Sequence, residues 1–336
     1  MINKAVIPVQ IKQLAQKFSD SRFSLYLVGG SVRDFLLDQT PKDWDFTTDA
    51  QPEEILKIIP EGYNNNKFGT VGLNTNIGLI EITTMRKEGD YKDHRHPSEV
   101  GWTDKIDEDL GRRDFTMNAI AFNLCGDEPI VDPFDGKTDL EQKSIKAVGD
   151  PNLRFQEDAL RMLRAVRFSA QLDFSIEQNT YNAIKENKEL LKEIAWERIR
   201  DELFKLLATD NAYQGIINLK DTGLLDIILP ELIQCFGLVQ EGPKHDRIYD
   251  IGEHSLLSLK FCSSKDSLVR FATLLHDIGK PNTYKVASDG NVTFYNHDVV
   301  GGQIAKNICR RFNLSREQTD KVYRLVRWHM FTISEN

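Results

Sequence analysis

Two adjacent glycines that follow an apolar run near the N-terminus constrain the fold of this chain more than any other feature. The run 25–28 predicts a strand, and Gly29 and Gly30 end it. Ser31 is then a candidate N-cap for a helix whose first turn carries Arg33. Backbone N–H groups at such a turn can approach an anion closely, and the helix dipole favours negative charge there. The pattern therefore predicts a phosphate-binding turn between a strand and a helix.

Two carboxylates stand at the start of the next predicted strand, 45–48. Asp43 and Asp45 are two residues apart, so an extended chain places them on the same face. Carboxylates side by side repel each other unless a divalent cation lies between them. An Asp-x-Asp pattern alone is more often a solvated strand end, and a lone glycine turn is common. A phosphate-binding turn followed by a carboxylate pair, however, is what metal-assisted nucleotidyl transfer needs.

In this order, the sequence GGSVRD…DWDF resembles the signature of the class II tRNA nucleotidyltransferases, which include the CCA-adding enzymes and the bacterial poly(A) polymerases. The resemblance implies an α+β protein. A polymerase beta-like catalytic head with a small mixed sheet is expected first, followed by an all-helical neck, body and HD-like domain. The expected bounds of these four parts are 1–140, 141–205, 206–240 and 241–336.

The resemblance also implies roles for the first motif. Asp43 and Asp45 are expected to act in catalysis by holding two Mg²⁺ ions. Gly29, Gly30 and Arg33 are expected to contact the nucleotide phosphates.

Glu81 is a third acidic residue of interest, in the predicted strand 77–84. Its apolar neighbours in the strand point to the opposite face, so its carboxylate is either exposed or turned toward Asp43 and Asp45 across the sheet. The family places an acidic residue in a similar motif, which reads Glu-Ile-Thr-Thr here. The resemblance therefore implies that Glu81 takes part in catalysis by orienting the primer end.

The segment 86–110 is polar and lacks periodicity, which predicts a long functional or mobile loop. It contains a Tyr-x-Asp-x-Arg-x-Pro pattern at 91–97. A loop of this type lies beside the active site in the family and is associated with addition of the terminal A. His94 and His96 belong to this loop and are expected to be solvated, because no further metal ligands accompany them.

The motif Arg-Arg-Asp-Phe-Thr-x-Asn-Ala follows this loop and is highly specific for the family. Charged residues directly before apolar ones indicate a charged surface anchored on a buried element. Arginine suits phosphate because its planar guanidinium can bond two oxygens at once. The resemblance implies that the nucleotide sugar and phosphates are contacted by Arg112, Arg113, Asp114 and Asn118.

The run 155–172 predicts one long helix with an apolar side. Its charged residues alone would indicate a surface salt bridge. They also match the Glu-Asp-x-x-Arg motif of the family, in which Asp and Arg bond the edge of the incoming base, accepting C and A and rejecting U and G. The resemblance thus implies base selection by Glu157, Asp158, Arg161 and Arg164.

The C-terminal part resembles an HD domain, a class that holds metals with histidine and aspartate and often hydrolyses phosphoesters. The matching residues are His254, His276, Asp277, His297 and His329. Met330 stands where the last aspartate ligand of the pattern is expected. A structural remnant is therefore expected in place of a working phosphohydrolase.

The amino-acid composition limits the classes of protein to which this chain can belong. With 336 residues the chain can form two or three domains, and its hydrophobic content of 40% and charged content of 28% are typical of a soluble globular protein. No run suits a membrane span or a signal peptide, and the four scattered cysteines suggest a reducing compartment. A cytoplasmic protein without a membrane partner is expected. The net charge of −8 argues against indiscriminate nucleic-acid binding but permits a local basic groove.

The combined motifs predict a template-independent enzyme that adds CMP and AMP from CTP and ATP to the 3′ end of tRNA. The expected partners are the acceptor stem and 3′ end of tRNA, CTP and ATP, with no prediction of oligomeric state. The alternatives are an A-adding enzyme that needs a separate CC-adding partner, and a poly(A) polymerase, whose characteristic extra segment is not found. An HD-type metal phosphohydrolase and a non-catalytic tRNA-binding module are alternatives of other classes.

Overall fold

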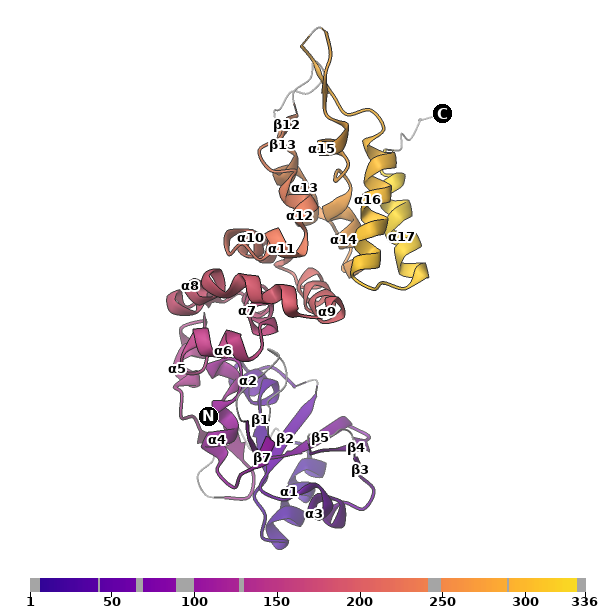
Figure 1. Ribbon diagram of the computed structural model, residues 1–336. Helices are drawn as coiled ribbons and strands as arrows, with labels where there is room; N and C mark the ends of the chain where they lie inside the picture. The colour runs from indigo at the N-terminus through magenta and orange to yellow at the C-terminus, as the bar shows by residue number, and fades with distance from the viewer. Residues whose placement is uncertain are drawn as a thin grey trace. The chain divides into compact units, whose positions relative to one another are not determined.

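The computed structural model describes residues 7–41, 43–64, 69–88, 100–126, 130–240, 249–288 and 290–330. Within them the chain forms two compact units. The first comprises Met1–Asp158 and Ser175–Thr180, and the second comprises Ala159–Phe174 and Tyr181–Asn336. The first unit contains the large sheet and the second is mainly helical (Figure 1). The predicted α+β class is confirmed, whereas the predicted bounds of neck, body and HD-like domain stay predictions.

The first unit is organised around a seven-stranded mixed sheet with the strand order β3-β4-β5-β2-β1-β8-β9. Strands β2 and β5 run parallel, and the other neighbours are antiparallel. The strands span β1 (Tyr26–Val28), β2 (Trp44–Thr48), β3 (Tyr63–Asn64), β4 (Thr70–Thr75), β5 (Gly78–Thr84), β8 (Ala121–Asn123) and β9 (Ile130–Val131). The strands predicted at 25–28, 45–48 and 77–84 are therefore present with small shifts at their ends.

Short helices accompany this sheet. They are α1 (Val9–Asp20), α2 (Gly30–Leu36), α3 (Pro52–Ile58), α4 (Ile106–Gly111), the 3-10 turn η2 (Thr116–Asn118), α5 (Gly136–Glu141) and α6 (Pro151–Glu157). A capping box of Gln51 and Glu54 begins α3, and the carboxylate of Asp49, just before it, accepts from the Ser24 N–H at 2.8 Å.

The segment expected to be one loop, 86–110, contains ordered structure at both ends. Strands β6 (Arg86–Glu88) and β7 (Val100–Trp102) pair antiparallel, and α4 follows them. The polar composition hid these elements because both strands are short. The predictions for 91–97, including His94 and His96, lie outside the described residues.

A further small pair joins β10 (Ser144–Ile145) to β11 (Ser175–Ile176) within the first unit. Helix α8 (Gln178–Asn187) begins in the first unit and continues in the second from Tyr181. The other helices of the second unit are α7 (Leu160–Leu172), the 3-10 segment η3 (Lys188–Glu193), α9 (Trp196–Leu207), α10 (Ala212–Asp221), α11 (Leu225–Ile228), α12 (Pro230–Ile233), α13 (Ile251–Phe261), α14 (Ser267–Leu275), α15 (Lys280–Thr283), α16 (His297–Arg311) and α17 (Arg316–Arg327). Two short pairs, β12 (Val239–Gln240) with β13 (Tyr249–Asp250) and β14 (Lys285–Val286) with β15 (Val292–Thr293), complete it.

The expectation of a single helix over 155–172 is wrong. Helix α6 ends at Glu157, and Asp158 adopts an extended conformation with φ −144° and ψ 102° before α7 begins at Leu160. The apolar periodicity continues across this break, so the sequence pattern alone could not reveal it. None of the helices in the described part of the chain combines the length and apolar composition that a membrane crossing requires.

Candidate active site

The predicted glycine turn lies between β1 and α2. Gly29 has a φ of +68°, a left-handed conformation that a side chain would strain, and it directly precedes the first residue of the helix. Ser31 does not cap this helix as expected. Its buried hydroxyl donates to the carbonyl oxygen of Asp43 at 2.9 Å and accepts from the N–H of Asp45 at 3.3 Å. These two hydrogen bonds of Ser31 link the glycine turn to the segment that contains Asp43 and Asp45.

The acidic residues meet where β2 and β5 pair. Asp45 and Glu81 are direct partners in the parallel register, and Asp43 lies exposed just before β2. Burial raises the pKa of Asp45, and the carboxylates of Glu81 and Asp43 raise it further, against the opposing effect of Arg113. An acidic residue held in this way has a strong preference for a nearby cation.

Arg113 connects the acidic residues with the glycine turn. A Cβ on Gly29 would lie 3.0 Å from Nη1 of Arg113, so the guanidinium lies directly against the turn. Nε of Arg113 is buried, and none of the residues that the structure describes forms a hydrogen bond with it. A buried donor of this kind is costly unless a ligand satisfies it. Arg113 is therefore placed to receive an anion beside the turn.

A second polar chain braces the same region. Arg33 is buried, and its guanidinium donates from Nη1 to Oδ1 of Asn118 at 3.0 Å and from Nε and Nη2 to Oδ1 of Asp34. Asn118 in turn donates from Nδ2 to Oδ1 of Asp114 at 3.0 Å, and the Phe115 N–H donates to the same oxygen. The structure thus brings together Arg33, Asp114 and Asn118, which the sequence analysis assigned to the nucleotide on separate motifs.

The four residues expected to select the base lie on both sides of the division between the units. Glu157 forms an ion pair with Arg154 at 3.1 Å in the first unit, which also holds Asp158. Arg161 and Arg164 belong to α7 in the second unit. The base-selecting arrangement of these residues stays a prediction.

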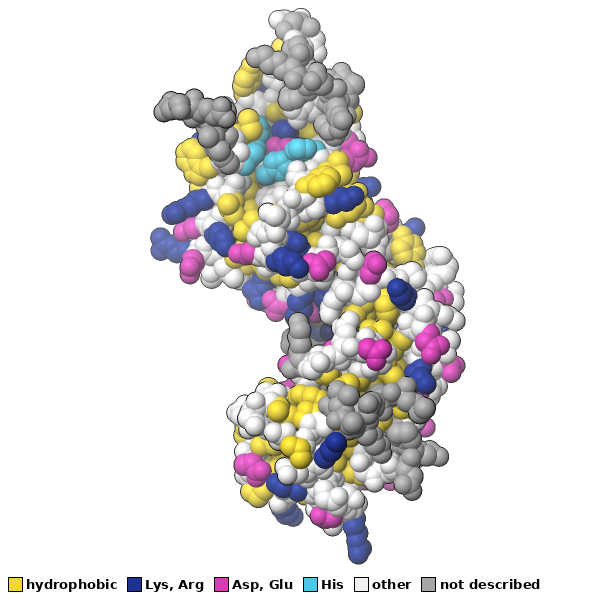
Figure 2. Space-filling view, turned by 180° about the vertical axis from the view of Figure 1, so that it is seen from behind, with side chains coloured by type: hydrophobic (Ala, Val, Ile, Leu, Met, Phe, Trp, Pro, Cys, Tyr) yellow, Lys and Arg dark blue, Asp and Glu magenta, His cyan; other side chains and the backbone are white. Residues whose placement is uncertain are grey.

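The second unit contains a compact histidine cluster around Asp277. Nε2 of His276 and of His254 lie 3.1 and 3.6 Å from Oδ2 of Asp277, and Nε2 of His297 and of His329 lie 3.4 and 3.6 Å from Oδ1. Figure 2 shows the described histidines as one group that reaches the surface. One buried carboxylate therefore serves two pairs of histidines.

The hydrogen bonds of this cluster favour metal binding. Nδ1 of His276, His297 and His329 each lies 2.7–2.9 Å from the carbonyl oxygen three residues earlier. Because a carbonyl only accepts, Nδ1 carries a proton in each ring, and Nε2 is the atom that faces Asp277. Nε2 donates to the carboxylate when the ring is protonated and offers its lone pair to a cation when the ring is neutral. Nε2 of His254 and of His276 are 3.1 Å apart, which two lone pairs tolerate only with a proton or cation nearby.

The charges around Asp277 agree with this geometry. Burial alone would raise the pKa of Asp277, but hydrogen bonds from His276, His297 and His329 lower it overall. Burial and the neighbouring His276 lower the pKa of His254. Burial would likewise lower the pKa of His329, but its hydrogen bond to Asp277 raises it overall. The cluster thus combines an ionised carboxylate with imidazoles that a cation would keep neutral.

In the described part of the chain, the groups of three or more potential ligands whose atoms lie within 4.8 Å of one another are His254–His276–Asp277 and Asp277–His297–His329. The second group uses side chains that the sequence analysis noted as fitting the pattern but left without a role. The acidic residues of the head are more widely spaced. Their chemistry still fits a divalent cation, because carboxylate oxygens are its preferred ligands.

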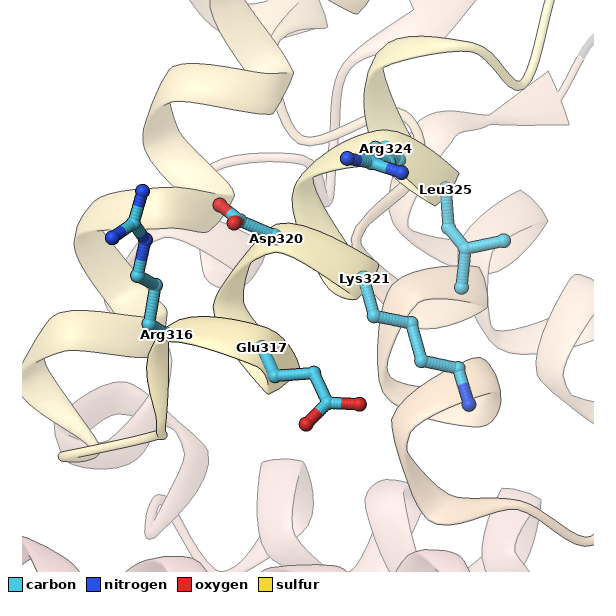
Figure 3. A pocket seen from close by; sticks show the side chains of 6 residues that line it. All are labelled: Arg316, Glu317, Asp320, Lys321, Arg324 and Leu325. Atoms are coloured by element: carbon cyan, nitrogen blue, oxygen red, sulfur yellow. The ribbon is translucent and has the colours of Figure 1, made fainter.

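A surface groove on α17 has no comparable chemistry. It is lined by Arg316, Glu317, Asp320, Lys321, Arg324 and Leu325, which all come from this one helix (Figure 3). Acidic and basic side chains are mixed along it, and Lys321 is paired with Asp266 at 2.6 Å. We assign no catalytic role to this groove.

Three protein families match successive parts of the chain. The poly A polymerase head domain matches residues 25–146. A family described as the probable RNA and SrmB-binding site of polymerase A matches residues 173–236, and the HD domain matches residues 248–336. The order of these matches is that expected from the motifs.

Individual proteins agree with these families. The chain is 44% identical over 241 residues to the CCA-adding enzyme of Lactobacillus helveticus, covering 70% of this chain and 60% of that protein. It is 46% identical over 222 residues to the CCA-adding enzyme of Ligilactobacillus salivarius, covering 65% of this chain and 54% of that protein. The chain thus spans somewhat more than half the length of these relatives.

Solved structures extend the similarity over nearly the whole chain. The crystal structure of the Bacillus stearothermophilus CCA-adding enzyme in complex with CTP matches with a TM-score of 0.72 and 29% identity, covering 94% of this chain and 68% of that chain. The Thermotoga maritima CCA-adding enzyme complexed with tRNA matches with a TM-score of 0.65 and 23% identity, covering 96% and 70%. The second match shows the shared fold alone.

Proposed function

Because this chain belongs to the family of class II tRNA nucleotidyltransferases and bacterial poly(A) polymerases, we propose that it adds CMP and AMP from CTP and ATP to the 3′ end of tRNA. The observation that carries the proposal is the direct pairing of Asp45 with Glu81 beside a glycine turn that Arg113 contacts. This arrangement offers an anion site and an acidic site in one place. Nucleotidyl transfer needs both.

The proposed reaction is attack by the 3′-oxygen of the RNA on the α-phosphorus of the nucleoside triphosphate. A bond forms between that oxygen and phosphorus, and the bond from phosphorus to the bridging oxygen of pyrophosphate breaks. Glu81 orients the hydroxyl and accepts its proton. Asp43 and Asp45 would hold two Mg²⁺ ions, which activate the hydroxyl and stabilise the departing charge when bound.

The glycine turn and the arginines bind the triphosphate. With no side chain at Gly29, phosphate oxygens can come close to the backbone N–H groups at the start of α2. Arg113 supplies a guanidinium whose buried Nε has no hydrogen-bond partner among the described residues, and Arg112 adjoins it. The base is then selected by Asp158 and Arg161, whose acceptor and donor groups suit the edges of C and A.

Three tRNA primers test this function and separate it from its relatives. The primers end at the discriminator base, at C and at CC, and each is incubated with Mg²⁺ and CTP, ATP or both. We expect extension of all three to CCA. Extension of the CC primer alone by one A would indicate an A-adding enzyme, long A tails would indicate a poly(A) polymerase, and no extension of any primer would contradict the proposal.

A second candidate function belongs to the histidine cluster of the second unit. We propose that it binds divalent metal and supports hydrolysis of phosphoesters, because the two pairs of histidines on Asp277 supply ligands that do not require an acidic residue at position 330. The expectation of a structural remnant rested on Met330, which stands where the pattern has an aspartate ligand. The structure supports the metal-binding alternative through His297 and His329.

Metal content measured on purified protein tests this second function. We expect His276→Ala and His329→Ala to lose bound metal, whereas Asp45→Ala, which lies in the other unit, should retain the metal of the cluster. Hydrolysis of bis(p-nitrophenyl) phosphate should follow the same pattern. Equal metal content and equal hydrolysis in the wild type and in both histidine variants would contradict the proposal.

A further inference from the structure

Asp109 precedes the arginine motif in the sequence, and its carboxylate contacts both arginines of that motif. Its carboxylate is completely buried in α4, with a side-chain exposure of 0%. Oδ1 accepts from Nε and Nη2 of Arg112 at 3.0 and 2.9 Å and from the N–H of Arg86 at 3.2 Å. Oδ2 accepts from Nη2 of Arg113 at 3.3 Å. Each carboxylate oxygen therefore holds one of the two adjacent arginines.

This carboxylate remains ionised in its buried position. Burial alone would raise the pKa of Asp109, but Arg112 and Arg113 outweigh burial, and hydrogen bonds from Arg112 and the Arg86 N–H add to them, so that the pKa is lowered overall. One negative charge is set against two guanidinium groups in this contact.

The hydrogen bond to Asp109 sets the orientation of the Arg113 guanidinium. With Nη2 bonded to Asp109, the same guanidinium places Nη1 against Gly29, and the buried Nε has no hydrogen-bond partner in the described part of the chain. The planar guanidinium cannot rotate about its own axis without breaking the bond to Asp109. The orientation of the Arg113 guanidinium next to the glycine turn is thus fixed.

We propose that Asp109 is a positioning residue, which orients Arg112 and Arg113 to receive the triphosphate of the incoming nucleotide. The proposal rests on the proposed nucleotidyl transfer and deepens it. Asp109 does not touch the nucleotide itself. It restricts the two side chains before the nucleotide arrives, which reduces the conformational entropy lost on binding.

The Asp109→Asn variant tests this role, because an amide keeps the shape but loses the charge and part of the accepting capacity. We expect the KM for CTP and for ATP to rise about ten- to a hundredfold, with kcat changed less than about threefold. The equilibrium Kd for nucleotide without primer should rise in parallel. Asp107→Asn serves as the matched control, since Asp107 is exposed on the same helix and should leave both constants unchanged.

A purely structural role for Asp109 gives a different result. Partial unfolding removes active molecules, so it lowers the apparent kcat and leaves the KM unchanged. A double-mutant cycle adds a second criterion: in an Arg113→Ala background, Asp109→Asn should have a much smaller effect on KM than in the wild type. A lowered kcat at unchanged KM, or fully additive effects in the cycle, would overturn the proposal.

A second variant keeps the test decisive if Asp109→Asn does not fold. Arg112→Lys retains the positive charge but cannot reproduce the paired Nε and Nη2 bonds to Asp109. We expect a similar rise in KM, and an unchanged KM would contradict the proposal. Failure of the wild-type protein to extend any tRNA primer would instead contradict the proposed function, so the two failures are distinguishable.

Discussion

Asp45 and Glu81 lie directly opposite each other on the parallel strands β2 and β5. Two carboxylates in this relationship repel each other, and the partial burial of Asp45 strengthens the effect. The fold tolerates this cost at the point where the proposed chemistry needs negative charge. Stability and function therefore oppose each other at Asp45, which gives the first prediction.

Replacing Asp45 with asparagine should stabilise the protein at neutral pH while removing its proposed activity. A carboxyl group whose pKa is raised by folding binds its proton more tightly in the folded state, so its ionisation costs stability as the pH rises from its ordinary pKa through its raised one. We expect the Tm of Asp45→Asn to exceed that of the wild type by about 1–4 °C at pH 7, measured without divalent metal. The difference should shrink as the pH falls below the ordinary carboxyl range, and a constant difference would contradict the account.

Alanine at Gly29 should weaken nucleotide binding. With φ +68° and ψ −135°, Gly29 has a conformation that would strain any side chain by about 1–3 kcal/mol, and the new Cβ would lie 3.0 Å from Nη1 of Arg113. We expect the KM for nucleotide to rise by about tenfold or more, measured by primer extension. Gly30→Ala is the matched comparison, because its Cβ makes only an ordinary contact at 3.5 Å. A larger effect at Gly30 than at Gly29 would count against this explanation.

The buried hydroxyl of Ser31 should matter for both stability and rate. Ser31→Ala leaves the N–H of Asp45 without its side-chain acceptor and the carbonyl of Asp43 without its donor. We expect a loss of about 1–3 kcal/mol in the free energy of unfolding, together with a lower kcat, because the aspartates lose their link to the glycine turn. Urea denaturation measures the first effect, and Ser21→Ala, an exposed site, should change it by less than about 0.5 kcal/mol. Equal losses in the two variants would disprove the bridging role.

Arg161 should determine which base is accepted. Arg161→Ala removes the donor proposed to bond the base edge, so we expect incorporation of UMP or GMP to approach that of CMP and AMP. Metal binding should be intact, because the acidic residues lie in the other unit. Single-nucleotide incorporation with each of the four triphosphates measures the selectivity. Selectivity equal to that of the wild type would remove Arg161 from base recognition.

The sequence was sufficient to predict the main features of the head. The strand that ends at Gly29 and the strand that begins near Asp45 follow from local apolar patterns and turn residues, which depend on neighbours in the sequence. The position of Glu81 beside Asp45 was one of two alternatives that strand periodicity left open, and the motif resemblance favoured the one that the structure contains.

The features that sequence analysis missed depend on contacts between distant segments. Ser31 has the residue type of a helix cap, but its hydroxyl bonds the segment of Asp43 and Asp45 instead. Asp109 gave no signal because nothing in its local pattern shows that it is buried between two arginines. Periodicity likewise could not show the break at Asp158, because the apolar positions continue across it. The one local indication of this break was Asp158 itself, because aspartate favours non-helical conformations.

The incorporation of AMP into a tRNA primer ending in CC, compared between the wild type and Asp45→Ala, tests the central claim most directly. Single-turnover conditions with Mg²⁺ and ATP isolate the chemical step. The account predicts addition of one A by the wild type and a loss of at least about a thousandfold in Asp45→Ala, with its circular dichroism spectrum unchanged. A correctly folded Asp45→Ala variant that incorporates AMP at the wild-type rate would contradict it.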